Sequence, residues 1–128
     1  MAEILVVDDD DVIRDTLSEL LSNEYRCQTA ATAEAALVKL RTGVFDVVLT
    51  DISMPGLSGL ELLSRVRNEF PTTPVIIISG FSDQEHAQKL KSLGAFDYLL
   101  KPFRLEVVEK SVARAIETRR DALRVKEF

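Results

Sequence analysis

Short aliphatic runs alternate with amphipathic stretches along the whole chain. Most of the runs are rich in branched side chains, which is typical of strands covered on both faces. Between them, apolar residues recur at three- and four-residue spacing, which is typical of helices. The predicted strands are residues 4–7, 25–30, 45–50, 75–78 and 96–99. The predicted helices are residues 12–21, a helix from the N-cap Thr32 to Gly43, residues 60–66, residues 82–93, and a last helix from Leu105 toward the C-terminus.

This alternation predicts an α/β fold built from five strand–helix units. Strands separated by helices pair in parallel with right-handed crossovers. We therefore expect a flavodoxin-like, doubly wound (βα)5 three-layer sandwich with the parallel strand order 2-1-3-4-5. Ligands of such sheets bind at the carboxyl ends of the strands, beside the switch in strand order. The expected site lies between the ends of the first and third strands.

Acidic residues follow both of these strands. Asp8, Asp9, Asp10 and Asp11 end the first strand, and Asp51 ends the third. Like charges at about 4 Å repel by roughly 4 kcal/mol near a protein surface, so converging carboxylates favour a bound cation. Mg²⁺ suits such oxygen ligands. We assign Asp8 and Asp9 to the metal, and interpret Asp10 and Asp11 as the start of the first helix, whose dipole favours negative charge.

The remaining strand ends carry groups suited to a phosphoryl ligand. Asp51 is the candidate nucleophile, because a carboxylate can form an acyl phosphate. Ser79 follows the fourth strand with a hydroxyl, and Lys101 follows the fifth with a compact positive charge. Each of these residues alone is a common surface or turn residue. Their combination on successive strand ends is far more specific.

Four segments carry a family resemblance: ILVVDD at residues 4–9, DVVLTDISMPG at 46–56, PVIIISG at 74–80 and GAFDYLLKPF at 94–103. Over about residues 2–118 the chain resembles a bacterial response-regulator receiver domain of the CheY-like type. The last segment and the final helix are most similar to receivers of the nitrogen-regulation class of transcription activators.

The resemblance implies a role for each residue of the predicted site. Asp51 is the expected phosphorylation site. Asp8, Asp9, Asp51 and the backbone carbonyl of Ser53 are the expected Mg²⁺ ligands, and Lys101 is the expected cation that binds the phosphoryl group. The resemblance also implies a phosphoprotein rather than an enzyme, with at most self-phosphorylation and autodephosphorylation.

The resemblance further implies a conformational switch. Ser79 is the expected switch hydroxyl and Tyr98 the expected switch aromatic, and the Lys101–Pro102 bond is expected to be cis. Two positions depart from the usual receiver. Ser79 stands where Thr is commoner, which preserves the hydroxyl, and Gly80 stands where Ala is usual, which loosens the loop backbone.

Composition narrows the expected partners. The formal net charge of −5 argues against direct nucleic-acid binding by this domain. No apolar run approaches the roughly 20 residues of a membrane span, and the single cysteine, Cys27, fits a reducing cytoplasm. By resemblance, the partners are a sensor histidine kinase and an output domain or effector. A homodimer through the last helix, or through the face of the fourth helix, fifth strand and fifth helix, is a further option.

Three rival interpretations are weaker. A phosphatase of the haloacid-dehalogenase type needs a second Asp two residues after the nucleophile, where this chain has Ser53. A flavin mononucleotide carrier needs phosphate-binding donors after the first strand, where Asp8 to Asp11 would repel phosphate. A degenerate receiver would lack some of the chemical residues, all of which are present.

The C-terminal residues leave two interpretations open. We expect a receiver domain over residues 1–118 and, over residues 119–128, either a frayed helical extension or the start of a helical linker to an output domain. The charged segment has an apolar stripe too short to prove a coiled coil. The only histidine, His86, lies among polar residues, so we interpret it as an exposed helix residue, and Met54 and Phe103 as packing residues.

Overall fold

The computed structural model describes residues 1–54, 56–80 and 84–126, and the side chains of all of these except residues 84–86, 125 and 126. Strands and helices alternate through these ranges, as predicted. The strands are β1 (Glu3–Val7), β2 (Arg26–Ala30), β3 (Val47–Asp51), β4 (Val75–Ser79) and β5 (Asp97–Leu100). The helices are α1 (Asp11–Leu21), α2 (Ala33–Thr42), α3 (Gly59–Glu69), α4 (Gln84–Ser92) and α5 (Leu105–Lys126).

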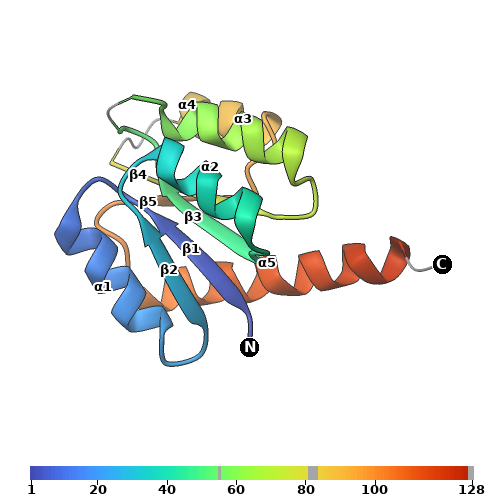
Figure 1. Ribbon diagram of the computed structural model, residues 1–128. Helices are drawn as coiled ribbons and strands as arrows, with labels where there is room; N and C mark the ends of the chain where they lie inside the picture. Colours follow the sequence, from blue (N-terminus) through green and yellow to red (C-terminus); the bar gives the residue numbers. More distant parts are fainter. Residues whose placement is uncertain (55, 81–83, 127–128) are drawn as a thin grey trace.

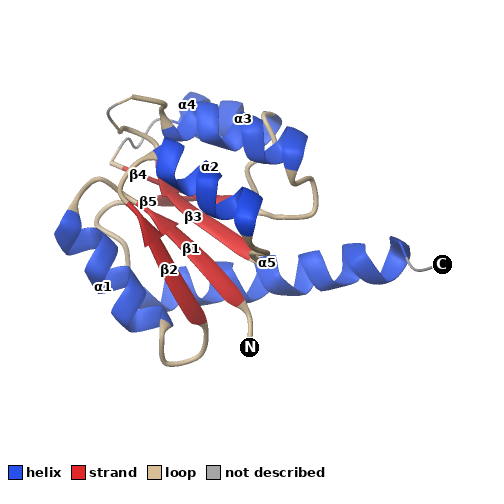
Figure 2. Ribbon diagram, in the orientation of Figure 1, coloured by secondary structure: helices blue, strands red, loops and turns tan. Residues whose placement is uncertain are grey.

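The strands form one parallel sheet in the order β2-β1-β3-β4-β5, which confirms the predicted doubly wound topology. Helices α2, α3 and α4 cover one face of the sheet, and α1 and α5 cover the other (Figures 1 and 2). Each face has its own cluster of buried aliphatic side chains. Strands β1, β3 and β4 contribute to both clusters, which is why their sequences read as nearly continuous apolar runs.

The boundaries of several elements differ slightly from those predicted. Thr32 caps α2 by accepting a hydrogen bond from the Ala35 amide at 3.1 Å, and α2 ends at Gly43, both as predicted. Strand β3 begins two residues later than the apolar pattern indicated. Asp46, directly before it, forms one backbone and one side-chain hydrogen bond with Glu3 of β1. Helix α4 was predicted from residue 82, and residues 81–83 lie outside the described part of the chain.

Helix α3 begins directly against the backbone of the residue that ends β3. A Cβ atom on Gly59 would lie 2.1 Å from the carbonyl oxygen of Asp51 and 2.7 Å from the Cα of Ile52. The Gly59 amide also donates to the carbonyl of Ile52 at 2.9 Å. Only glycine permits this approach, so Gly59 fixes the end of β3, and with it Asp51, relative to α3.

Helix α5 continues without a break past the predicted domain boundary and extends beyond the sheet (Figure 1). Arg119 still contacts the body, because its Nη1 lies 2.9 Å from Oδ1 of Asp46 in a half-buried ion pair. The division into residues 1–118 and 119–128 stays a prediction. Among the described residues, no helix combines the length and the apolar character that crossing a membrane requires.

Replacing Gly59 by alanine should destabilise the protein by about 3 kcal/mol, because the added methyl group meets rigid backbone rather than a side chain that can move. Chemical denaturation of both proteins measures this difference. Gly80→Ala is the matched control, since a Cβ there meets no described atom within 4 Å. We expect that control to change stability by less than about 0.5 kcal/mol. Equal effects of the two substitutions would contradict the close approach of α3 to Asp51.

Candidate functional site

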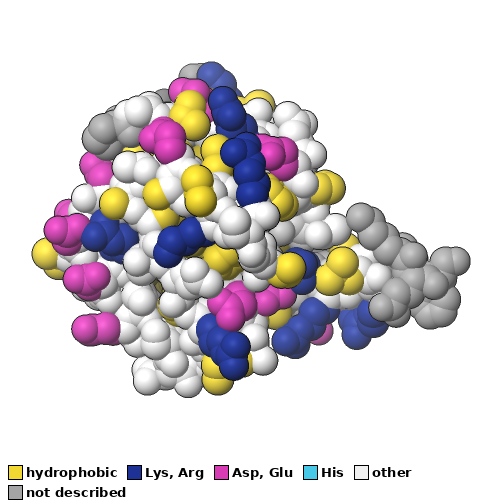
Figure 3. Space-filling view, viewed as in Figure 1, with side chains coloured by type: hydrophobic (Ala, Val, Ile, Leu, Met, Phe, Trp, Pro, Cys, Tyr) yellow, Lys and Arg dark blue, Asp and Glu magenta, His cyan; other side chains and the backbone are white. Residues whose placement is uncertain are grey.

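The fold brings three carboxylates together at the carboxyl ends of β1 and β3. One oxygen atom from each of Asp8, Asp9 and Asp51 lies within 4.8 Å of the other two. Asp8 is 1% exposed and Asp51 is 8% exposed, whereas Asp9 is exposed. Figure 3 shows acidic side chains gathered along the side of the molecule that carries α1. The cluster is therefore deep at Asp8 and Asp51 and open to solvent at Asp9.

The ammonium group of Lys101 lies beside the two buried carboxylates. The Nζ atom of Lys101 is 3.4 Å from Oδ1 of Asp51 and 3.6 Å from Oδ2 of Asp8. These distances exceed those of direct hydrogen bonds, so the contacts are ion pairs. The Lys101 amide donates to the carbonyl of Ser79 at 2.8 Å, which fixes the start of the loop after β5. Lys101 thus places a positive charge beside Asp8 and Asp51.

Burial raises the pKa of the Asp8 carboxyl above its ordinary value of 3.8. The hydrogen bond from the Asp10 amide, at 2.9 Å, and the charge of Lys101 lower that pKa, while the charges of Asp51 and Asp9 raise it further. The net direction is upward, because removing a carboxylate from water disfavours its charged form. Burial thus makes the ionised form of Asp8 less favourable than it is in water, and a divalent cation beside the carboxylate would favour that form.

The donor set fits a magnesium ion. It consists of carboxylate oxygens, the ligands that hard cations prefer, and the exposed side of the cluster leaves room for the waters that Mg²⁺ retains. Ser53 lies in the exposed segment two residues after Asp51. Its carbonyl as a further ligand stays a prediction.

The two predicted switch residues lie on neighbouring strands. Ser79 is fully buried at the end of β4, directly after Ile78, which pairs with Asp51 in the sheet. Tyr98 is half-buried on β5, opposite Ile77, and packs against the core beneath α2, α3 and α4. Strand β5 is thus the link between the acidic edge, through Lys101, and the aromatic ring of Tyr98.

Asp10 and Asp11 serve the first helix, as predicted. Asp10 is the N-cap of α1 and accepts hydrogen bonds from the amides of Val12 and Ile13 at 2.9 and 3.3 Å. Asp11 lies in the first turn of α1. The interpretation of these two residues as helix-starting groups is confirmed.

Two residues that contact the site region were missed by sequence reasoning. Arg14, in α1, donates from Nη1 to the backbone carbonyl of Asp8 at 2.8 Å. Glu34, in α2, accepts a hydrogen bond from the Leu57 amide at 2.8 Å and lies against Gly56, whose φ is +78°. The helical spacing of Arg14 from Asp10 would have indicated a contact with the preceding loop, whereas Glu34 had no comparable signal.

The structure also gives the positions of the remaining residues that the sequence analysis singled out. Met54 and Phe103 pack against the two clusters of buried aliphatic side chains, as expected. Cys27 is half-buried, and burial raises the pKa of its thiol. The Lys101–Pro102 bond is cis, as the resemblance implied. Pro55 and the side chain of His86 lie outside the described part of the chain.

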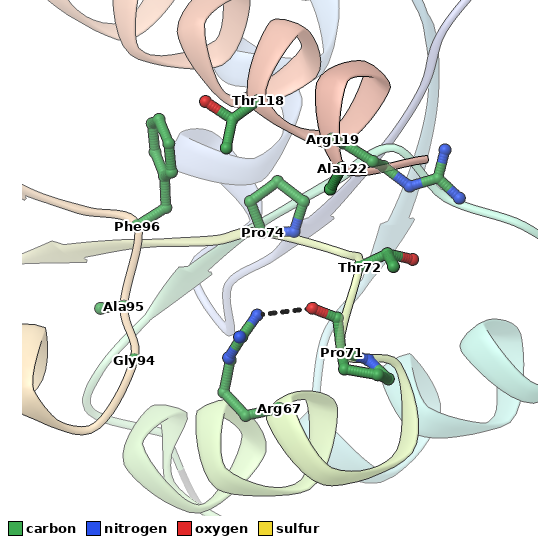
Figure 4. A pocket seen from close by; sticks show the side chains of 10 residues that line it. All are labelled: Arg67, Pro71, Thr72, Pro74, Gly94, Ala95, Phe96, Thr118, Arg119 and Ala122. Carbon is green, nitrogen blue, oxygen red and sulfur yellow. Dashed lines mark hydrogen bonds between the residues drawn. The ribbon is translucent and has the colours of Figure 1, made fainter. Parts of the chain in front are cut away.

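A separate cavity of about 430 Å³ lies at the other end of the sheet (Figure 4). It is formed by the end of α3, the residues that precede β4 and β5, and the second half of α5. Arg67 crosses its floor and donates from Nη1 to the carbonyl of Pro71 at 3.0 Å. This cavity lies at the amino ends of the strands, whereas the acidic cluster lies at their carboxyl ends, so the two are distinct.

Comparison with known proteins agrees with this geometry. DNA-binding transcriptional regulator NtrC of Salmonella typhimurium is 40% identical over 114 residues, which make up 88% of this chain and 24% of that protein. This chain thus spans about a quarter of the length of the curated relatives that it matches.

Solved structures show the same similarity. A response regulator receiver domain protein from Clostridium thermocellum superposes with a TM-score of 0.87 at 32% identity, covering 96% of this chain and 99% of that one. The BeF3-activated receiver domain of DrrB superposes with a TM-score of 0.85 at 37% identity, covering 91% of this chain and 98% of that one. Residues 4–113 match the model of the response regulator receiver domain. The chain therefore belongs to the response regulator receiver domain family of two-component systems.

Proposed function

We propose that Asp51 accepts a phosphoryl group from the phosphohistidine of a sensor histidine kinase, in a reaction that requires Mg²⁺. The observation that carries this proposal is the convergence of Asp8, Asp9 and Asp51 within 4.8 Å, with the ammonium of Lys101 3.4 Å from Asp51. Three carboxylates and an ammonium thus lie at one edge of the sheet. Such a group suits phosphoryl transfer, in which positioning and charge stabilisation supply most of the catalysis.

The transfer itself is a displacement at phosphorus. A carboxylate oxygen of Asp51 forms a new bond to phosphorus, and the phosphorus–nitrogen bond to the kinase histidine breaks. The electron pair of that bond stays on the imidazole, and the product on this chain is an acyl phosphate. Lys101, next to Asp51, is placed to contact the phosphoryl oxygens as their charge develops. Asp8, Asp9, Asp51 and the Ser53 carbonyl would hold Mg²⁺, which would supply further positive charge for the same oxygens.

The chemical step is coupled to a change of surface in this proposal. The Ser79 hydroxyl moves toward the acyl phosphate, and Tyr98 turns further into the space that Ser79 leaves. The face formed by α4, β5 and α5 then changes shape. Phosphorylation biases this equilibrium only to the extent that it interacts differently with the two states. The half-buried position of Tyr98 on β5, the strand directly before Lys101, supports the coupling.

The chain acts as a signalling input rather than as a turnover enzyme. Its similarity to NtrC supports an output domain that regulates transcription, joined through the helix that continues past residue 118. A homodimer through α5 or through the face of α4, β5 and α5 would present two receivers together. Any activity of the chain alone is limited to its own phosphorylation and dephosphorylation.

The first test is labelling with acetyl phosphate. Wild type should gain the mass of one phosphoryl group only when Mg²⁺ is present, and Asp51→Asn should gain none, because the amide is not a nucleophile at this centre. Intact-protein mass spectrometry measures the gain. Asp15→Asn is the control, since Asp15 is an exposed acidic residue of α1 outside the cluster. Equal labelling of wild type and Asp51→Asn would refute the assignment.

A second prediction concerns Lys101. Lys101→Ala should still fold, because Lys101 lies in the loop after β5 and outside both clusters of buried aliphatic side chains, and it should still reach some labelling. Its phosphorylation-dependent changes in amide chemical shifts over α4, β5 and α5 should be strongly reduced, since the cation that links the phosphoryl group to β5 is gone. Wild-type shift changes in labelled Lys101→Ala would show that Lys101 is a bystander.

A third prediction uses the raised pKa of Asp8. Since burial disfavours its charged form, ionised Asp8 weakens the ion-free fold at neutral pH, and that cost vanishes as the pH falls through the folded-state pKa. Asp8→Asn should therefore melt a few degrees higher than wild type at pH 7 without metal. This difference in melting temperature should disappear as the pH falls toward 3.8, the ordinary pKa of an Asp carboxyl.

With Mg²⁺ present, wild type should instead be more stable than Asp8→Asn. Wild type gains about 2.7 kcal/mol at a Mg²⁺ concentration one hundred times its Kd, and Asp8→Asn gains little because it has lost a ligand. Thermal melts with and without Mg²⁺ measure both effects. A less stable Asp8→Asn at pH 7 without metal would contradict the cause given for the pKa shift.

A further inference from the structure

The loop that carries Asp8 and Asp9 is held from α1 by one arginine. The Nη1 atom of Arg14 donates to the backbone carbonyl of Asp8 at 2.8 Å, and its Nη2 pairs with the carboxylate of Asp11. The Arg14 side chain is only 16% exposed. An arginine with both ends of its guanidinium engaged and most of its surface covered holds a defined geometry, unlike a solvated surface charge.

This contact acts on the peptide plane between the two acidic residues. The carbonyl of Asp8 and the amide of Asp9 belong to one rigid unit, so fixing the carbonyl also fixes the direction in which the chain leaves toward Asp9. The Asp8 carboxylate is held independently by the Asp10 amide at 2.9 Å. In the described part of the chain, nothing is hydrogen-bonded to the exposed Asp9 carboxylate, so its placement depends on that backbone.

We propose that Arg14 is a positioning residue for magnesium binding: it fixes the Asp8–Asp9 peptide so that the Asp9 carboxylate meets those of Asp8 and Asp51. This inference rests on the magnesium site of the proposed function and adds a residue that never touches the ion. Removing a group that orients the ligands of a metal typically weakens binding of that metal 10–100-fold.

The positive charge of Arg14 allows an experiment to distinguish its positioning role from a purely electrostatic effect on Mg²⁺ binding. A cation close to an acidic cluster opposes the binding of a second cation, so its removal on electrostatic grounds alone would tighten Mg²⁺ binding. Loss of positioning would weaken it. The two causes therefore predict opposite signs for the same substitution.

The test is calorimetric titration of the whole chain with magnesium chloride at neutral pH. Arg14→Ala should bind Mg²⁺ about tenfold more weakly than wild type. Arg14→Lys, which keeps the charge but not the planar fork, should fall between them. Asp11→Asn is the matched control, because it removes the negative charge of the Nη2 partner, keeps an oxygen that can accept there, and leaves the contact with Asp8. It should stay within about twofold of wild type. Circular dichroism melts check that each variant is folded.

Two further readouts separate positioning from a general loss of structure. Amide hydrogen exchange of Asp9 and Asp10 should accelerate in Arg14→Ala, while exchange in β1 should not change. In acetyl-phosphate labelling, Arg14→Ala should need about tenfold more Mg²⁺ for half-maximal rate and approach the wild-type rate at saturation.

Each outcome decides the proposal. Equal or tighter Mg²⁺ binding by Arg14→Ala, with wild type binding normally, overturns the role of Arg14 and leaves the proposed function intact. Wild-type affinity in Arg14→Lys together with tighter binding in Arg14→Ala would show that Arg14 acts only through its charge. Absence of Mg²⁺ binding by wild type itself overturns the magnesium site and this inference together.

Discussion

Mutual repulsion of carboxylates is the constraint on which this structure depends. One carboxylate oxygen from each of Asp8, Asp9 and Asp51 lies within 4.8 Å of the others, and the ammonium of Lys101 forms ion pairs with the two buried members. Each close pair costs roughly 4 kcal/mol near a surface. The fold tolerates this cost because the rest of the sheet is a tightly packed aliphatic core. The same repulsion favours binding of a cation, because a cation between the carboxylates removes it.

Backbone contacts, more than side-chain packing, hold this acidic edge in place. Gly59 lets the start of α3 touch the carbonyl of Asp51, and the Asp10 amide holds the carboxylate of Asp8. Arg14 reaches the same loop through a carbonyl oxygen. Backbone groups are stiff, so these contacts set the spacing of the carboxylates before any ligand arrives. Preorganisation of this kind is what phosphoryl transfer requires of a protein.

The sequence predicts the fold and the location of the site well, because both follow from periodicity and from the rule for parallel sheets. The strand order 2-1-3-4-5 and the meeting of Asp8, Asp9 and Asp51 needed no coordinates. The contacts of Arg14 and Glu34 were missed, since they join helices to loops whose path local patterns do not specify. The close approach of Gly59 to Asp51 depends on the distance between the start of α3 and the end of β3, which no spacing rule provides. The roles of Ser53, Ser79 and Tyr98 come from resemblance and stay predictions.

The most direct measurement of the central claim is a crystal structure of this chain with Mg²⁺ and beryllium fluoride, a mimic of the phosphoryl group. The account predicts one magnesium ion at about 2.1 Å from carboxylate oxygens of the acidic cluster. It also predicts the beryllium group on Asp51 and the Lys101 ammonium against its fluorides. An ion bound elsewhere, or a beryllium group on any other side chain, would contradict the account.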